Sequence, residues 1–132
     1  DRFYIHEHQG RAVVLLFWTT YCVHCKQALL SLDGLKLQFP GLPVTVAGVC
    51  CDPENREALS GIVSSLGLTY PILLDSGGKQ LRRYGEPEFP TLLIIDPKGR
   101  LVLVRTGFSP AIEAQMKNKI TALFQSKDAS WK

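Results

Sequence analysis

The chain has 132 residues and a formal net charge of +3, with 45% hydrophobic and 20% charged residues. This balance is typical of a globular domain long enough to bury a core, and it excludes a disordered or fibrous chain. The basic residues are scattered, with one tight pair at Arg82-Arg83, so nucleic-acid binding is not expected. No apolar run is as long as a membrane span, and no signal peptide stands at Asp1. We expect one domain over residues 1–132, with a flexible tail over 126–132, in a chain that is either mature and trimmed or intracellular.

The first half of the chain alternates strand and helix patterns. A short edge strand is predicted over Arg2 to Ile5, and a buried apolar strand over Ala12–Phe17. Apolar residues then recur at helical spacing up to about Gln38 and stop before Pro40-Gly41. A second buried strand, rich in β-branched residues, is predicted over Val44–Cys50.

The next segment begins with Asp52-Pro53, which predicts a helix N-cap followed by proline at the first helical position. The apolar face of this helix continues until Gly67 ends it. A short strand is predicted over Tyr70–Leu74, and a single helical turn carries Leu81 and Tyr84.

The last segment predicts a β-hairpin and a helix. Strands over Thr91–Ile95 and Leu101–Arg105 are joined by the turn Asp96–Gly99, and Ser109-Pro110 begins a helix that reaches about Phe124. The element order is β-β-α-β-α-β-β-β-α, which predicts an α/β fold with parallel pairing early and an antiparallel hairpin late.

Two cysteines two residues apart, Cys22 and Cys25, lie between the strand Ala12–Phe17 and the first helix. This spacing allows a small disulfide or a dithiol. At the helix start, unpaired N–H groups and the positive end of the helix dipole would stabilise a Cys22 thiolate. We therefore predict Cys22 as the nucleophile and Cys25, one turn further and more buried, as the resolving cysteine.

Three stretches carry a family resemblance. Residues 17–22 read F-W-T-T-Y-C, residues 70–75 read Y-P-I-L-L-D, and residues 89–100 read F-P-T-L-L-I-I-D-P-K-G-R. They resemble the F-W-A-T-W-C, F-P-V-L-x-D and V-P-T-T-F-L-I-D-x-x-G-x motifs of the thioredoxin superfamily, in particular its TlpA/ResA-like thiol–disulfide oxidoreductases. The resemblance runs from Phe3 to about Phe124 and implies a thioredoxin-like three-layer sandwich, with a mixed central sheet flanked by helices.

The resemblance also implies an activity. It implies a thiol–disulfide oxidoreductase, expected to be a reductase, that exchanges disulfides with protein partners and needs no cofactor beyond Cys22 and Cys25. It further implies that Pro90 follows a cis peptide bond and packs against the disulfide. Because proline has no N–H, the backbone of Phe89 would stay free to pair with a substrate strand.

Four residues around the cysteines are expected to support the site. His24 can carry a positive charge near neutral pH and would stabilise the Cys22 thiolate, which makes the disulfide more oxidising. Val23 replaces the proline common at that position in the family. Trp18 and Tyr21 flank the site. They can serve as core packing and a surface lip, or as a hydrophobic platform for substrate peptides or partner domains, and for Trp18 we expect both.

The proton carrier of the site differs from that of thioredoxins proper, because Leu16 stands where they have a buried aspartate. Another carboxylate would then have to serve Cys25. Two candidates, Asp52 and Glu54, follow the second strand. Two others, Glu86 and Glu88, precede Pro90 and are ranked lower because their loop is short and polar.

A second cysteine pair, Cys50-Cys51, ends the strand Val44–Cys50 at the sheet edge where α/β folds place their sites. Adjacent cysteines rarely form a disulfide. We favour two small buried residues, and a secondary redox or metal role is the alternative.

A metal site is not expected. C-x-x-C can be half of a zinc site, but closing it needs a second pair such as Cys50-Cys51, or His24 with another histidine. His6 and His8 lie in what we predict to be a solvated N-terminal loop. Copper delivery by thioredoxin-fold chaperones uses a longer cysteine spacing.

The expected partners are protein thiols and disulfides, together with an upstream thiol reductant or oxidant. The resemblance implies an extracytoplasmic bacterial setting, periplasmic or membrane-anchored, where this chain is part of a larger one or tethered, with cytochrome c assembly as a common role. A monomer is expected. Two rival functions are a thioredoxin-fold peroxidase and a redox-silent or metal-binding docking module.

Overall fold

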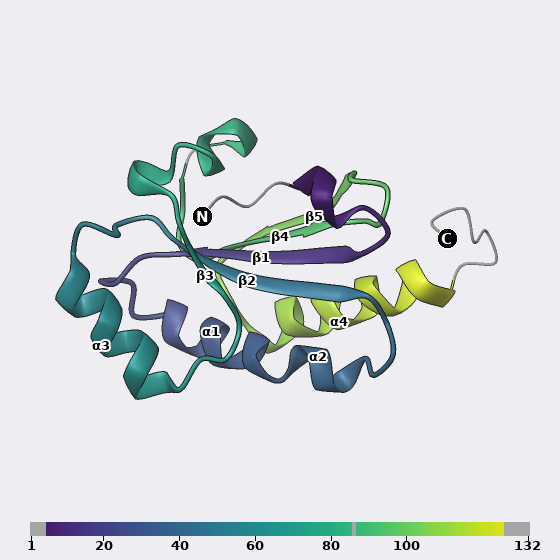
Figure 1. The fold of residues 1–132 in the computed structure, drawn as a ribbon, viewed down its shortest axis with the longest axis horizontal. Helices are drawn as coiled ribbons and strands as arrows, with labels where there is room; N and C mark the ends of the chain where they lie inside the picture. Colours follow the sequence, from purple (N-terminus) through teal and green to yellow (C-terminus); the bar gives the residue numbers. More distant parts are fainter. Residues whose placement is uncertain (1–4, 86, 126–132) are drawn as a thin grey trace.

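A five-stranded mixed sheet forms the centre of the computed structural model, which describes residues 5–85 and 87–125 (Figure 1). The strand order is β3-β2-β1-β4-β5. The bounds are β1 (Ala12–Trp18), β2 (Val44–Cys50), β3 (Ile72–Leu74), β4 (Thr91–Ile95) and β5 (Leu101–Thr106). β2 pairs in parallel with β1 and β3, whereas β4 pairs antiparallel with β1 and β5. The predicted α/β fold with a mixed central sheet is confirmed.

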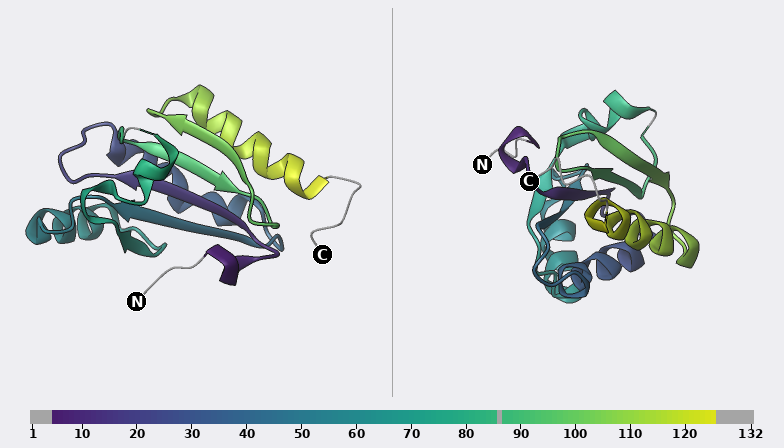
Figure 2. Two further views of the ribbon diagram at one scale, coloured as in Figure 1. Left: turned by 90° about the horizontal axis from the view of Figure 1, so that it is seen from above. Right: turned by 90° about the vertical axis from the view of Figure 1, so that its right-hand side faces the viewer.

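The helices flank this sheet (Figure 2). The α-helices are α1 (Cys25–Asp33), α2 (Leu35–Gln38), α3 (Arg56–Leu66) and α4 (Pro110–Gln125). Three short 3-10 helices are η1 (Ile5–His8), η2 (Ser76–Gly78) and η3 (Leu81–Tyr84). Residues of all four α-helices pack in one hydrophobic cluster with β1 and β2, and on the opposite face Leu81 of η3 joins the second cluster.

β1 is the central strand, and all seven of its residues are buried. Val14, Leu16 and Trp18 belong to the cluster on the helical face, and the residues between them belong to the other. Both faces of β1 are therefore covered, which explains its continuous apolar run in place of an alternating pattern.

Several predicted boundaries differ from the structure. The first helix begins at Cys25 and is interrupted at Gly34, where α2 follows α1. α3 has Asn55 as its N-cap, so the prediction that Asp52 caps this helix is wrong. Of the predicted edge strand, residues 2–4 lie outside the described residues, and Ile5 begins η1.

Other boundaries are confirmed. Gly67 ends α3 with a φ of 62°, the left-handed conformation that favours glycine. The Ser109 hydroxyl accepts a hydrogen bond from the N–H of Ile112 at 3.2 Å and so caps α4. The predicted tail, 126–132, lies outside the described residues.

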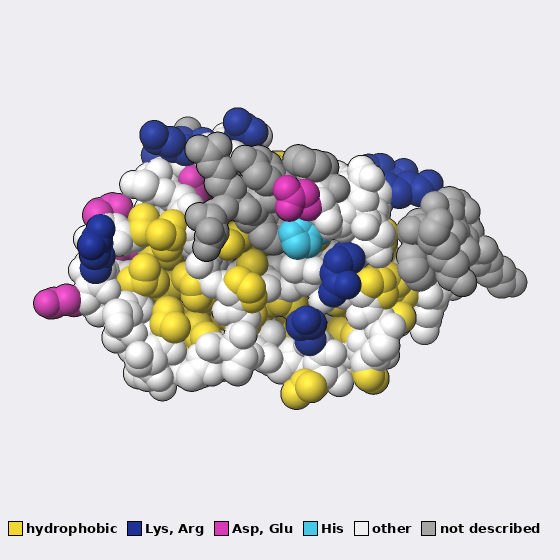
Figure 3. Space-filling view, in the orientation of Figure 1, with side chains coloured by type: hydrophobic (Ala, Val, Ile, Leu, Met, Phe, Trp, Pro, Cys, Tyr) yellow, Lys and Arg dark blue, Asp and Glu magenta, His cyan; other side chains and the backbone are white. Residues whose placement is uncertain are grey.

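The surface has one prominent apolar region on the face shown in Figure 3, where hydrophobic side chains gather over α3 and β3. β3 is an edge strand, and its Leu74 is exposed. Within the described part of the chain, no helix is both long enough and apolar enough to cross a lipid bilayer.

Candidate active site

The two cysteines of the C-x-x-C segment and Pro90 lie at the same end of the sheet. In the parallel ladder Trp18 of β1 pairs with Cys50, so β1 and β2 end side by side. In the antiparallel ladder Phe17 pairs with Thr91, the first residue of β4. Pro90 therefore lies beside the end of β1. The segment that carries the cysteines begins directly after this end of β1.

Cys22 and Cys25 form a disulfide, with their Cα atoms 5.4 Å apart. Cys25 is the first residue of α1 and is 1% exposed, whereas Cys22 is half-buried. Cys22 lies in a turn before the helix, where its N–H donates to the Thr19 carbonyl at 3.3 Å and its own carbonyl accepts the Cys25 N–H at 3.3 Å. The helix thus begins three residues later than Cys22, so the prediction that Cys22 lies at the helix start, with Cys25 one turn further, is wrong. Cys22 is the more accessible of the two cysteines, as predicted.

The residues flanking the disulfide differ sharply in exposure. Tyr21 is 74% and Val23 80% exposed. His24 is the N-cap residue of α1, and its exposed side chain makes no capping hydrogen bond. Trp18 is fully buried, so core packing is confirmed for it and the prediction that it also forms a surface platform is wrong.

Asp52 is the candidate carboxylate that the structure brings to the cysteine loop. Its Oδ1 accepts the N–H of Thr20 at 2.9 Å, and its Oδ2 accepts the Thr20 hydroxyl at 2.5 Å. The Cys50 thiol also donates to Oδ1, at 3.3 Å. Thr20 is two residues before Cys22, and the sequence did not single it out.

The other candidate carboxylates are placed differently. Glu54 is exposed and accepts a hydrogen bond from the Ser76 hydroxyl at 3.2 Å. Glu88 is exposed, and its backbone carbonyl accepts the Thr91 hydroxyl at 2.5 Å. Glu86 lies outside the described residues. A role for these three in proton transfer stays a prediction.

Cys50 and Cys51 are free thiols on opposite faces of the sheet. Cys50 belongs to the cluster on the helical face, and Cys51 to the cluster on the other face. Burial, ahead of the nearby carboxylates, raises the pKa of each thiol to about 12. Both are therefore protonated at neutral pH, in agreement with the interpretation as small buried residues.

The Phe89–Pro90 peptide bond is cis, as the resemblance implied. Pro90 is buried, and its carbonyl accepts the N–H of Gly107 at 2.8 Å. Phe89 is half-buried and packs against both hydrophobic clusters. The direct contact of Pro90 with the disulfide stays a prediction.

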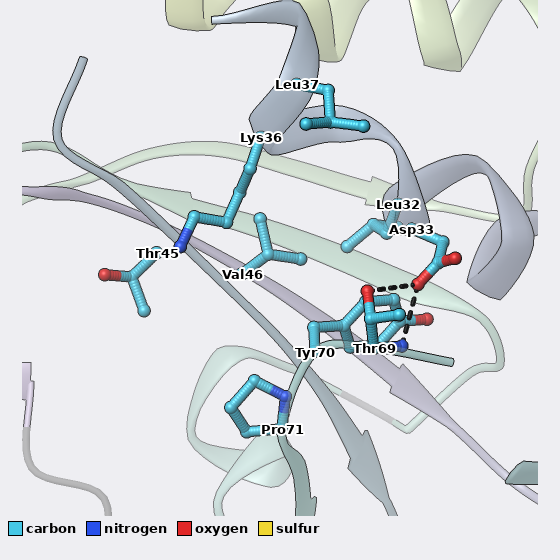
Figure 4. Close-up of a pocket in the computed structure, with 9 residues that line it drawn as sticks. All are labelled: Leu32, Asp33, Lys36, Leu37, Thr45, Val46, Thr69, Tyr70 and Pro71. Carbon is cyan, nitrogen blue, oxygen red and sulfur yellow. Dashed lines mark hydrogen bonds between the residues drawn. The ribbon is translucent and has the colours of Figure 1, made fainter. Parts of the chain in front are cut away.

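A pocket of about 340 Å³ lies between the α1–α2 segment and β2, at the other end of β2 from Cys50 (Figure 4). Its lining includes Thr45 and Val46 near the start of β2. On one side Asp33 accepts hydrogen bonds from the N–H and hydroxyl of Thr69, both at 2.8 Å. Because none of its lining residues belongs to the cysteine loop, this pocket is separate from the disulfide.

Among residues 5–85 and 87–125, no group of three or more histidines, cysteines or carboxylates is arranged to hold a metal ion. His6 and His8 lie in η1, so the prediction that they occupy a loop is wrong.

Comparison with known proteins agrees with this fold. The chain belongs to the AhpC/TSA family, whose model matches residues 2–104. It is 30% identical over 103 residues to the thiol-disulfide oxidoreductase ResA of Halalkalibacterium halodurans, covering 78% of this chain and 58% of that protein. It is also 30% identical over 99 residues to ResA of Bacillus subtilis strain 168, covering 75% and 55%. The chain thus spans a little over half the length of these two relatives.

The fold itself is shared with a solved structure described as a thiol:disulfide interchange protein DsbE, from Chlorobium tepidum. The TM-score is 0.81 at 24% sequence identity, with 90% of this chain and 84% of that chain covered. This confirms the thioredoxin-like fold.

Proposed function

We propose that this chain is a thiol–disulfide oxidoreductase that exchanges disulfides with protein partners through Cys22 and Cys25. The observation that carries the proposal is their disulfide at the start of α1, where one cysteine is half-buried and the other buried. Such an arrangement makes the Cys22 sulfur accessible to a partner and keeps the Cys25 sulfur buried until the resolving step. The names of the two ResA relatives support the same activity.

The exchange has two steps, written here for the reductase direction. The Cys22 thiolate attacks a partner disulfide, a mixed disulfide forms, and the displaced partner sulfur takes up a proton. Cys25 then loses its proton, and its thiolate attacks Sγ of Cys22 and breaks the mixed disulfide. The partner leaves with two thiols, Cys22 and Cys25 are joined, and two electrons have passed to the partner.

The cysteine pair is itself the redox group, so the proposed chemistry calls for no organic cofactor and no metal. The exposed side chains of Tyr21 and Val23 border Cys22 and offer a partner protein apolar contact. A second thiol protein must reduce the pair after each turnover. We further propose an extracytoplasmic bacterial setting, tethered or within a larger chain, with cytochrome c assembly as the role that the resemblance favours.

The test is the redox equilibrium of the Cys22–Cys25 pair. Purified protein is equilibrated in glutathione buffers, quenched with acid, alkylated and weighed by mass spectrometry. Cys22→Ser is the control that cannot form the disulfide. The Cys51→Ala variant should give the same curve, because burial keeps this thiol protonated at neutral pH.

A potential near about −270 mV would support the reductase direction, and one near about −120 mV would make the chain a disulfide donor. If no disulfide forms at any glutathione ratio, the proposed function is wrong. Rapid consumption of hydrogen peroxide by the reduced protein would instead favour the peroxidase alternative.

A further inference from the structure

We infer that Asp52 is a positioning residue that holds the Cys22 loop in place through Thr20. This inference rests on the proposed function, because it concerns how the same cysteine pair is kept ready for exchange. It also gives Asp52 a different role from the proton carrier that its place in the sequence suggested.

The hydrogen bonds around Asp52 form a closed set. Three donors reach its two carboxylate oxygens: the N–H and the hydroxyl of Thr20, and the Cys50 thiol. The Thr20 hydroxyl also accepts the side-chain amide of Asn55 at 3.2 Å. Hydrogen bonds to a carboxylate are among the stronger ones in proteins, so this set ties Thr20 firmly to the segment after β2.

The Asp52–Thr20 pair continues the contact between β1 and β2 beyond the sheet. The ladder ends with Trp18 beside Cys50, followed by a hydrogen bond from the Cys51 N–H to the Trp18 carbonyl at 2.8 Å. Two residues beyond Trp18 and Cys50, the two segments are joined by hydrogen bonds from Thr20 to the Asp52 side chain instead of by backbone hydrogen bonds. Cys22 is only two residues beyond Thr20, so the position of its loop is fixed relative to the sheet.

The same contacts speak against proton transfer by Asp52. The donors described on its carboxylate come from Thr20 and Cys50, not from the disulfide cysteines. A carboxylate occupied in this way is suited to orient a loop. By keeping Cys22 close to Cys25 when the pair is reduced, it raises their effective concentration and so favours disulfide formation.

The experiment compares Asp52→Ala, Asp52→Asn and Thr20→Val in the glutathione equilibrium described above. Asp52→Ala removes both hydrogen bonds between Thr20 and the carboxylate and should lower the equilibrium constant for oxidation about tenfold, a shift of about 30 mV. Thr20→Val keeps the backbone N–H but removes the hydroxyl, so a smaller decrease in the same direction is expected. The double variant Asp52→Ala/Thr20→Val should be no worse than Asp52→Ala, since the two residues act as one unit.

Asp52→Asn separates the two roles. Asparagine can still accept the Thr20 N–H with its oxygen and donate to the Thr20 hydroxyl oxygen, so a positioning residue should be largely rescued. A proton carrier would not be rescued, because an amide cannot take up the proton. Glu57→Gln, an exposed change in the first turn of α3, is the matched control and should leave the equilibrium unchanged.

A second readout does not depend on redox activity. The Thr20 amide should exchange slowly with solvent in the native protein and at least tenfold faster in Asp52→Ala, whether or not a disulfide partner is present. Unchanged exchange and an unchanged glutathione equilibrium in Asp52→Ala would overturn the inference, as would an Asp52→Asn variant as impaired as Asp52→Ala. If Asp52→Ala does not fold, Thr20→Val supplies the same comparison. A native protein that forms no reversible disulfide refutes the proposed function, and amide exchange then decides the anchoring separately.

Discussion

Gly48 in the middle of β2 is a position where the fold leaves no room for a side chain. A Cβ placed there would lie 3.1 Å from Cε1 of Tyr70, 3.2 Å from Nε1 of Trp18 and 3.3 Å from Cδ1 of Ile72. Trp18 and Tyr70 are large, buried side chains of the core that lies on the helical face. The absence of a side chain at Gly48 thus allows two aromatic rings to pack against the sheet.

Gly48→Ala should therefore lower the free energy of unfolding by about 1–3 kcal/mol, the usual cost of overpacking a core. Gly61 in α3 is the matched control, because a Cβ there meets no atom within 4 Å. Gly61→Ala should stabilise the protein by up to about 1 kcal/mol through helix propensity. Urea unfolding followed by circular dichroism measures both. Equal effects of the two substitutions would contradict the packing described for Gly48.

The hairpin between β4 and β5 is organised by one carboxylate. Oδ1 of Asp96 accepts the N–H groups of Lys98 at 3.0 Å and Arg100 at 2.8 Å, and Oδ2 accepts Nε of Arg100 at 2.8 Å. Burial alone would raise the pKa of Asp96, but these hydrogen bonds and the guanidinium charge together hold its pKa below the ordinary value. The ionised carboxylate is thus favoured by the native turn.

This turn should make stability depend on pH in the acid range. Because the folded-state pKa of Asp96 is the lower one, its contribution is complete well above the ordinary value of about 3.9 and disappears as pH falls through the folded-state pKa. Asp96→Asn should cost on the order of 1 kcal/mol at pH 7 and progressively less as the pH falls below the ordinary pKa of an aspartate. Thermal unfolding of both proteins from neutral to acid pH is the measurement, with Glu57→Gln as control. A constant difference across the range would show that charge is not the cause.

Local sequence patterns predicted most elements but not the contacts between distant ones. The strands β1, β2 and β4 were predicted to within one residue because their apolar runs are short and bounded. The break at Gly34 was missed because Leu32 and Leu35 on either side of it keep helical spacing. Asp52-Pro53 was predicted to start a helix. The local pattern cannot reveal that the Asp52 carboxylate accepts hydrogen bonds from Thr20, 32 residues earlier, instead of capping the helix.

The candidate site was predictable to a similar extent. The cysteine spacing identified Cys22 and Cys25, and the resemblance supplied Pro90 with its cis bond. Asp52 stood among four carboxylates that the sequence ranked only loosely. Its pairing with Thr20 depends on where β1 and β2 end relative to one another, which is a property of the tertiary structure.

At the scale of the whole molecule, one sheet is shared by two hydrophobic clusters. The residues of β1 alternate between the cluster under the α-helices and the cluster on the opposite face. Neither cluster can lose its packing without exposing one side of the same central strand. The described residues should therefore unfold as one unit.

Urea unfolding should accordingly give one transition, with the same midpoint by far-ultraviolet circular dichroism and by the near-ultraviolet signal of the aromatic side chains. This also tests the prediction that the chain is a single domain. Two midpoints that differ by more than the fitting error would contradict it and would point to a separately stable part.

The placement of Cys50 and Cys51 on opposite faces of the sheet has a practical consequence for labelling. Successive side chains of a strand point in opposite directions, so these neighbours in the sequence do not present two sulfurs on one side. A trivalent arsenical binds tightly only where two sulfurs can coordinate the same arsenic atom. We therefore expect it not to react with Cys50 and Cys51 in the native protein and to bind the reduced Cys22 and Cys25 instead. Such compounds would then report selectively on the oxidation state of Cys22 and Cys25.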